Sequence, residues 1–174
     1  MGIEENGQLE EAEKTAPPQG FLSDLVAQFD MAQWRQSAGQ DVVEVPPSDL
    51  LAFARASRMA GYELCSDVTA VDWFRKRPVR FEVVINLVSL SRRARLRVIV
   101  PVPADDPVVP SIVEVWPGAN FGEREVYDLF GIRFEGHPDL TRILMPDDWE
   151  GYPLRKDFEI GSVPVQFKDS PKVG

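Results

Sequence analysis

The sequence predicts an α+β domain of two layers, in which helices pack on one face of a mixed, largely antiparallel sheet. Two observations carry this prediction. Near the middle of the chain, apolar and polar residues alternate on both sides of a short polar turn, which is typical of an antiparallel hairpin with one buried face. Helical patterns precede and follow this hairpin. The chain has 174 residues, and a chain of this size buries roughly 70% of its unfolded surface, which is enough for one core.

The N-terminal part begins with an acidic segment and continues into a helix. Residues 1–20 are rich in glutamate and nearly free of apolar anchors, so we expect a disordered tail. The glutamates are also the opposite of the basic start of a signal peptide. From Phe21 to Phe29, apolar residues recur at a spacing that forms one stripe on a helix.

A short strand and a second helix follow. Residues 41–45 read as the strand, and Ser48 is a candidate N-cap for the helix. Gly61 is expected to end this helix. The side chains expected to face inward are Leu50, Leu51, Ala54 and Met59.

The middle of the chain is β. Residues 64–74 form one expected strand, and residues 79–90 and 96–102 form the two arms of the hairpin around Arg92 and Arg93. Four prolines after residue 100 are expected to end the sheet.

A third helix fits Ala119 to Phe130, with Gly131 as its stop. Its apolar contacts are expected to be Phe121, Val126, Leu129 and Phe130, and its polar positions Glu123, Arg124, Glu125 and Asp128. The α+β domain is therefore placed at residues 21–137. Residues 138–174 show no period and hold five of the fifteen prolines, so we expect an extended, partner-binding tail.

The counts of single residue types exclude much chemistry. One cysteine and one histidine cannot supply a zinc site or an iron–sulfur cluster. No disulfide can form within the chain and no run approaches 18 apolar residues, so a soluble, cytoplasmic protein is expected. Cys65 is interpreted as a buried structural thiol and His137 as a turn or interface histidine.

Three carboxylates on the third helix leave two interpretations open. Glu123, Glu125 and Asp128 could perform acid–base chemistry or hold a metal ion. Arg124 and Asp128 stand at i and i+4, which indicates a salt-bridge group on the helix surface. The spacing favours the salt bridges.

The hairpin and its approaches carry eight basic residues and one acidic residue, Glu82. The basic residues are Arg75, Lys76, Arg77, Arg80, Arg92, Arg93, Arg95 and Arg97. Such a surface could bind nucleic acid. The net charge of −9 and the absence of a base-stacking aromatic pattern favour an acidic protein partner instead.

A motif in the third helix and beyond it resembles a known family. The motif combines Glu123-Arg124-Glu125, Asp128, Leu129-Phe130, His137 and the downstream Arg142. It resembles the signature of the 30-kDa subunit of respiratory complex I, the bacterial NADH-quinone oxidoreductase. Residues 67–72 and 151–157 resemble two further segments of this family. Thr141 and Tyr152 depart from the pattern, in which arginine and histidine are usual.

The resemblance implies a non-catalytic structural subunit in the peripheral arm of a proton-translocating NADH:quinone oxidoreductase. It implies no cofactor or metal on this chain, with FMN and iron–sulfur clusters on partner subunits. The implied partners are the 49-kDa subunit and other peripheral-arm subunits of complex I, not nucleic acid. The complex would hold the chain at the cytoplasmic side of the cell membrane. The residues expected at the partner interface are Glu123, Arg124, Glu125, Asp128, His137, Arg142, Arg155, Lys156 and Asp157.

Other functions stay open at this point. A homologous subunit could serve a ferredoxin- or F420-dependent quinone oxidoreductase or a membrane-bound hydrogenase. Alternatives of another class are a stand-alone carboxylate or metal enzyme and a nucleic-acid-binding module. The tail holds many apolar anchors between its prolines, which favours a strap laid over another protein; the resemblance names the 49-kDa subunit as that protein.

Overall fold

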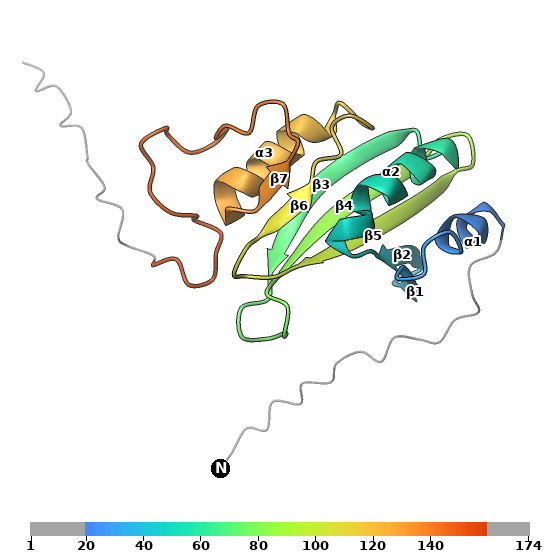
Figure 1. Ribbon diagram of the computed structural model, residues 1–174, viewed down its shortest axis with the longest axis horizontal. Helices are drawn as coiled ribbons and strands as arrows, with labels where there is room; N and C mark the ends of the chain where they lie inside the picture. Colours follow the sequence, from blue (N-terminus) through green and yellow to red (C-terminus); the bar gives the residue numbers. More distant parts are fainter. Residues whose placement is uncertain (1–19, 160–174) are drawn as a thin grey trace, which may run out of the picture.

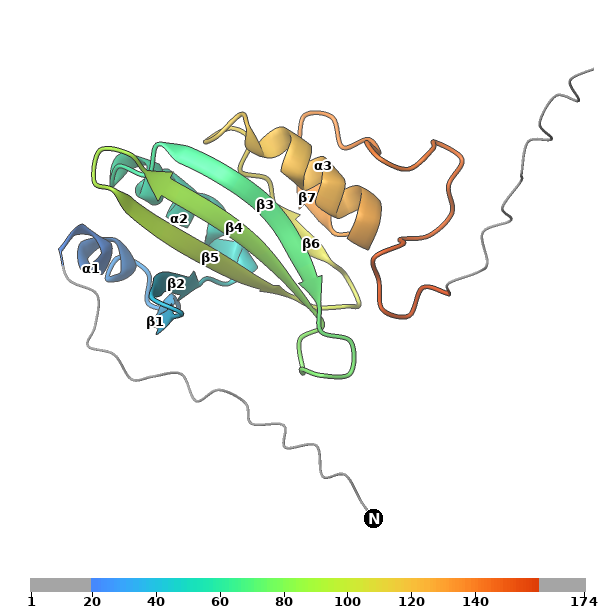
Figure 2. The same cartoon turned by 180° about the vertical axis from the view of Figure 1, so that it is seen from behind.

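The computed structural model describes residues 20–159 and shows a five-stranded sheet with helices and a second, small sheet around it (Figures 1 and 2). In sheet order the strands are Gln33–Ser37 (β1), Gln40–Glu44 (β2), Ala94–Val102 (β5), Phe81–Ser89 (β4) and Leu64–Asp72 (β3). Within this five-stranded sheet only the β2–β5 pair is parallel. The predicted mixed, largely antiparallel sheet and α+β class are confirmed. The expected acidic tail lies almost wholly outside the described residues.

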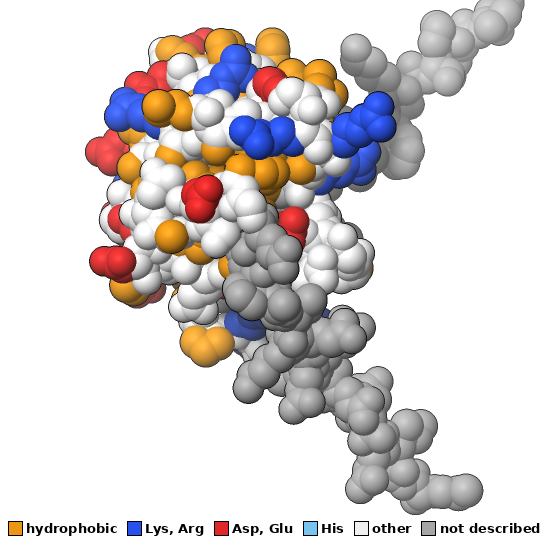
Figure 3. Space-filling view, turned by 90° about the vertical axis from the view of Figure 1, so that its right-hand side faces the viewer, with side chains coloured by type: hydrophobic (Ala, Val, Ile, Leu, Met, Phe, Trp, Pro, Cys, Tyr) orange, Lys and Arg blue, Asp and Glu red, His pale blue; other side chains and the backbone are white. Residues whose placement is uncertain are grey.

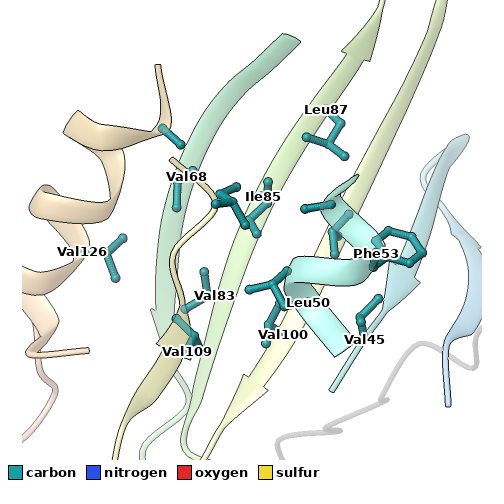
Figure 4. Close-up of a cluster of buried hydrophobic side chains, with 14 of the residues drawn as sticks. Val45, Leu50, Phe53, Val68, Val83, Ile85, Leu87, Val100, Val109 and Val126 are labelled. Carbon is teal, nitrogen blue, oxygen red and sulfur yellow. The ribbon is translucent and has the colours of Figure 1, made fainter. Parts of the chain in front are cut away.

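The hairpin of β4 and β5 builds the centre of the core. Its inward side chains face one another in register, with Val83 opposite Val100 and Ile85 opposite Val98. All four are at most 2% exposed. Figure 4 shows Val83, Ile85 and Val100 of this layer beneath helix α2, which carries Leu50 and Phe53. The alternation of side chains along each strand therefore places these residues together on the inner face of the sheet.

Helix α2 (Leu50–Met59) lies across one face of the sheet, after a short 3-10 turn at Pro47–Asp49 (η1). Phe53 is fully buried in the core. Two predictions here are wrong. Met59 is 89% exposed, and the hydroxyl of Ser48 bonds to the Asp49 carboxylate and caps no backbone N–H. Helix α1 (Phe21–Val26) is shorter than expected and adds two core leucines.

Helix α3 (Ala119–Phe130) has the predicted bounds and lies beside β3, the edge strand of the sheet (Figures 1 and 2). The approach is close at Gly122, where an added Cβ would stand 2.9 Å from the Val68 Cβ and 3.0 Å from its carbonyl oxygen. Gly131 ends the helix in the left-handed conformation. The helix thus shields an edge strand that would otherwise be open to other chains.

Three short strands were not predicted. Val108–Pro110 (β6) and Arg133–Glu135 (β7) form a parallel pair, and β1 pairs with β2. β6 and β7 have three residues each, which is too short to show alternation. β1 has the sequence QWRQS, which carries no apolar period. No helix among residues 20–159 is long and apolar enough to cross a membrane.

Candidate functional site

The buried carboxylate of Asp128 binds the segment that follows the domain. Its side chain has no solvent exposure. Asp128 Oδ1 accepts a hydrogen bond from Arg142 Nη1 at 2.6 Å. Oδ2 accepts the backbone N–H groups of Ile143 at 3.0 Å, Leu144 at 2.7 Å and Met145 at 2.8 Å. One carboxylate therefore fixes four consecutive residues on helix α3.

These contacts keep Asp128 charged inside the protein. Burial acts to raise the pKa of this carboxyl, but the N–H groups of Met145 and Leu144 and the Arg142 guanidinium outweigh it and hold the pKa below its usual range. The expected surface pair between Arg124 and Asp128 is wrong. Arg124 instead donates to the carbonyl oxygens of Thr141 at 3.1 Å and Arg142 at 3.0 Å.

A second buried aspartate, Asp72 at the end of β3, binds the same C-terminal segment at a later point, around residues 156 and 157. Arg80 reaches Asp72 with two hydrogen bonds, from Nε at 3.0 Å and from Nη2 at 2.9 Å. Asp72 Oδ2 also accepts the Lys156 backbone N–H at 2.9 Å. The same guanidinium binds Asp157, with its Nη2 2.5 Å from Oδ1. Burial opposes the charge of Asp72, but these donors hold its pKa below the usual range.

Between the two aspartates, the segment covers the end of helix α3. Arg155 Nε donates to the Phe130 carbonyl oxygen at 2.6 Å, and the Leu154 N–H donates to the Leu129 carbonyl oxygen at 3.1 Å. These bonds satisfy carbonyl groups that a helix end leaves unpaired. The ring of Tyr152, the residue that departs from the family pattern, lies directly over Gly131.

We call residues 138–159 the closing segment. It holds no helix or strand, as predicted for an extended tail. The expectation that only a partner's surface orders the tail is wrong for these residues, however, because they lie on the chain's own helix α3 and strand β3. Binding of a partner by the tail stays a prediction. Among the expected interface residues, Asp128, Arg142, Arg155, Lys156 and Asp157 all take part in these internal contacts. Asp72 and Arg80 are not among the expected interface residues of the motif; Arg80 is a candidate only as part of the basic hairpin surface.

Glu123 is a third buried carboxyl, and it differs from the other two. It has no exposed surface. Oε1 accepts the Ile112 N–H at 2.7 Å, while Oε2 has no hydrogen-bond partner among the described residues. Burial raises the pKa of Glu123 to about 7, against smaller opposing effects of the nearby Ser111 side chain and the Ile112 N–H. The prediction that Glu123 and Asp128 lie on a polar surface is wrong, since only Glu125 of the three carboxylates is exposed.

The remaining candidates have plain structural surroundings. His137 lies in a turn, where its Nδ1 accepts the Asp139 N–H at 3.0 Å. Cys65 is half-buried, with Sγ 3.6 Å from the Asp67 carbonyl oxygen, and burial raises the pKa of its thiol to about 12. Within residues 20–159, no group of three or more His, Cys, Asp or Glu side chains is placed to hold a metal ion.

The basic residues of the hairpin do not form one surface. Those at 75–80 precede β4 and those at 92–93 follow it, so they lie at opposite ends of a nine-residue strand. Arg77 pairs with Glu82, and Arg80 pairs with Asp72. Figure 3, which faces the side of α1, shows basic, acidic and hydrophobic side chains interspersed.

Two solved structures share this fold. A trypsin-resistant fragment of Nqo5 superposes with a TM-score of 0.62 at 37% sequence identity, over 68% of this chain and 96% of the fragment. A chain of the membrane-bound sulfane sulfur reductase, an archaeal respiratory membrane complex, reaches a TM-score of 0.71 over 88% of this chain and 96% of its own length; at 24% identity it supports the fold alone. The fold therefore also occurs in a chain of an archaeal respiratory membrane complex.

The family follows from the sequence comparison. Residues 43–163 match the family described as "Respiratory-chain NADH dehydrogenase, 30 Kd subunit", and the chain belongs to this family. The NADH-quinone oxidoreductase C subunit of Geobacter sulfurreducens is 45% identical over 132 residues, which cover 76% of this chain and 80% of the relative. That of Saccharopolyspora erythraea is 51% identical over 107 residues, 62% of this chain. The match spans only 43% of that relative's length.

Proposed function

We propose that the chain is a non-catalytic structural subunit of a proton-translocating NADH:quinone oxidoreductase. One observation carries this proposal: Asp128, Arg142 and Arg124 of the family motif bind one another or the backbone. Asp128 binds Arg142 and three N–H groups, and Asp72 binds Arg80 and the closing segment. Carboxylates that are charged and saturated in this way stabilise the fold and are poor bases for catalysis.

The finer assignment rests on the relatives. They are named as the C subunit of NADH-quinone oxidoreductase, so we place the chain in the peripheral arm beside the 49-kDa subunit, at the cytoplasmic side of the membrane. In this assignment FMN and the iron–sulfur clusters belong to partner subunits, and electrons pass from NADH to quinone without entering this chain. Its share is to hold neighbouring subunits in register.

The test is purification of the native complex in mild detergent through a tag on the full-length chain. We expect co-purification of flavin-binding, iron–sulfur and membrane subunits with NADH:quinone oxidoreductase activity, and neither flavin nor iron on the isolated chain. Stoichiometric flavin or iron on the isolated chain would contradict the proposal. Recovery of ferredoxin-, F420- or hydrogen-oxidising subunits would instead assign the chain to one of the related complexes.

A further inference from the structure

Exposed apolar side chains gather at one groove of the molecule. The groove lies between the first half of β3, the first half of α3 and the start of the closing segment, and has a volume of about 210 Å³. That is roughly seven times the volume of one water molecule in the liquid, so a whole side chain fits. Three residues that line it are exposed: Phe121 by 64%, Leu144 by 56% and Ile143 by 37%. Leu64, 46% exposed, precedes the lining residue Cys65.

The charges at this groove have one sign. Asp67 and Glu125 are its only charged lining residues. Glu125 is exposed on helix α3. Asp67 receives one long hydrogen bond, 3.4 Å from the Asn86 amide. No Lys or Arg lines the groove to neutralise these two carboxylates, so a cation from outside the groove is the complementary ligand.

We propose that this groove docks a segment of a neighbouring subunit that inserts an apolar side chain flanked by Lys or Arg. The proposal rests on the assignment of the chain to a multisubunit complex. The apolar walls supply burial energy in proportion to the area covered, and the two carboxylates select a basic flank. A second copy of this chain fits poorly, because a two-fold contact at the groove would bring like charges together.

The experiment uses the assembled complex with the photo-reactive residue p-benzoylphenylalanine in place of Phe121. We expect irradiation to cross-link the chain to one segment of another subunit, and mass spectrometry to find Lys or Arg within a few residues of the cross-link. The same residue in place of Leu144 should reach the same segment. The control position is Leu154, which is 48% exposed and does not line the groove. The photo-reactive residue at this position should not cross-link to this segment.

The basic flank is tested by reversing one charge. Glu125→Lys should reduce the cross-link yield from position 121 roughly tenfold, because the new lysine would face the basic flank with a like charge; a factor of ten corresponds to about 1.4 kcal/mol. Glu150→Lys, the same change at another exposed glutamate outside the groove lining, is the matched control. Thermal unfolding of each variant shows that it folds.

Several results would overturn the docking proposal while leaving the subunit assignment intact. They are a cross-link to a second copy, to another part of this same chain or to an acidic segment, and the absence of any cross-link in a fully assembled complex. The subunit assignment fails separately, when the tagged chain recovers no redox subunits.

Discussion

Glu123 and Asp128 lie on the same helix, and neither side chain of the pair is exposed to solvent. Their surroundings nevertheless favour opposite protonation states. Asp128 faces a guanidinium and three backbone N–H donors, which hold its pKa below the usual range against the effect of burial. Glu123 has one backbone donor and no cation, so burial raises its pKa to about 7. Burial opposes the charge of both carboxyls, and only at Asp128 do the donors outweigh it.

The first prediction concerns Glu123 and pH. The pKa of this carboxyl rises from 4.5 in the unfolded chain to about 7 in the folded protein. Its ionisation therefore costs stability that is absent below about pH 4.5, grows between pH 4.5 and 7, and is complete above pH 7. Glu123→Gln cannot ionise, so its free energy of unfolding should exceed the wild-type value by about 1–3 kcal/mol at pH 8 and match it near pH 4.5.

Urea denaturation at both pH values measures this difference. The exposed Glu125→Gln on the same helix is the control and should change stability by less than about 0.5 kcal/mol at either pH. A Glu123→Gln variant that is destabilised equally at pH 4.5 and 8 would show that the carboxyl is ionised and bound in the native protein.

The second prediction concerns Asp128→Asn. An amide in this place offers one oxygen and one NH2 group to four donors, and it leaves Arg142 without a counter-ion. We expect a loss of about 3–5 kcal/mol in the free energy of unfolding at pH 7. Asp139→Asn, which changes an exposed carboxylate in the closing segment, should stay close to wild type. Equal stability of the two variants would mean that the hydrogen bonds of Asp128 contribute nothing to the free energy of unfolding.

At the scale of the elements, the hairpin and helix α3 were predictable because their patterns are long and regular. The buried face of α3 could also have been predicted from the helical period. Four of its buried residues form one stripe, namely Ala119, Glu123, Val126 and Phe130. Hydrophobicity alone placed Phe121 inside and Glu123 outside, and both placements are wrong. The partners of Asp72 and Asp128 could not be predicted, since they lie up to 84 residues away and the closing segment has no period.

A third prediction tests how the closing segment seats on α3. Gly131 and Gly136 both have positive φ, at 71° and 81°, so alanine at either position costs about 1 kcal/mol or more in backbone strain. At Gly131 the added methyl group would also overlap the Tyr152 ring, while at Gly136 it meets nothing within 4 Å. Gly131→Ala should therefore be the more destabilising change in urea denaturation.

The Tyr152→Ala background isolates the overlap. There the two glycine substitutions should have nearly equal effects, because only backbone strain remains. An undiminished difference between them would show that the ring is not what Gly131 accommodates.

For the whole molecule, the two aspartates join the closing segment to the domain at two separate points. The fourth prediction is that hydrogen exchange on the free full-length chain shows protected amides at 143–145 and at 156, without any partner subunit. Asp128→Asn should release 143–145 first, and Asp72→Asn should release 156 first. Unprotected amides in the free chain would restore the interpretation of a segment ordered only by a partner.

The long separation between Asp72 and the Lys156 amide also sets an order of events during synthesis. A ribosome adds about 5–20 residues per second, so the 84 residues from 73 to 156 take roughly 4–17 s to appear. The sheet has time to form within that interval, with Asp72 held by Arg80 and the Phe74 N–H. The nascent domain then carries an open end of helix α3 until translation of the closing segment covers it. Chaperones that bind unfinished chains would meet that helix end, and a ribosome stalled before residue 156 would leave it uncovered.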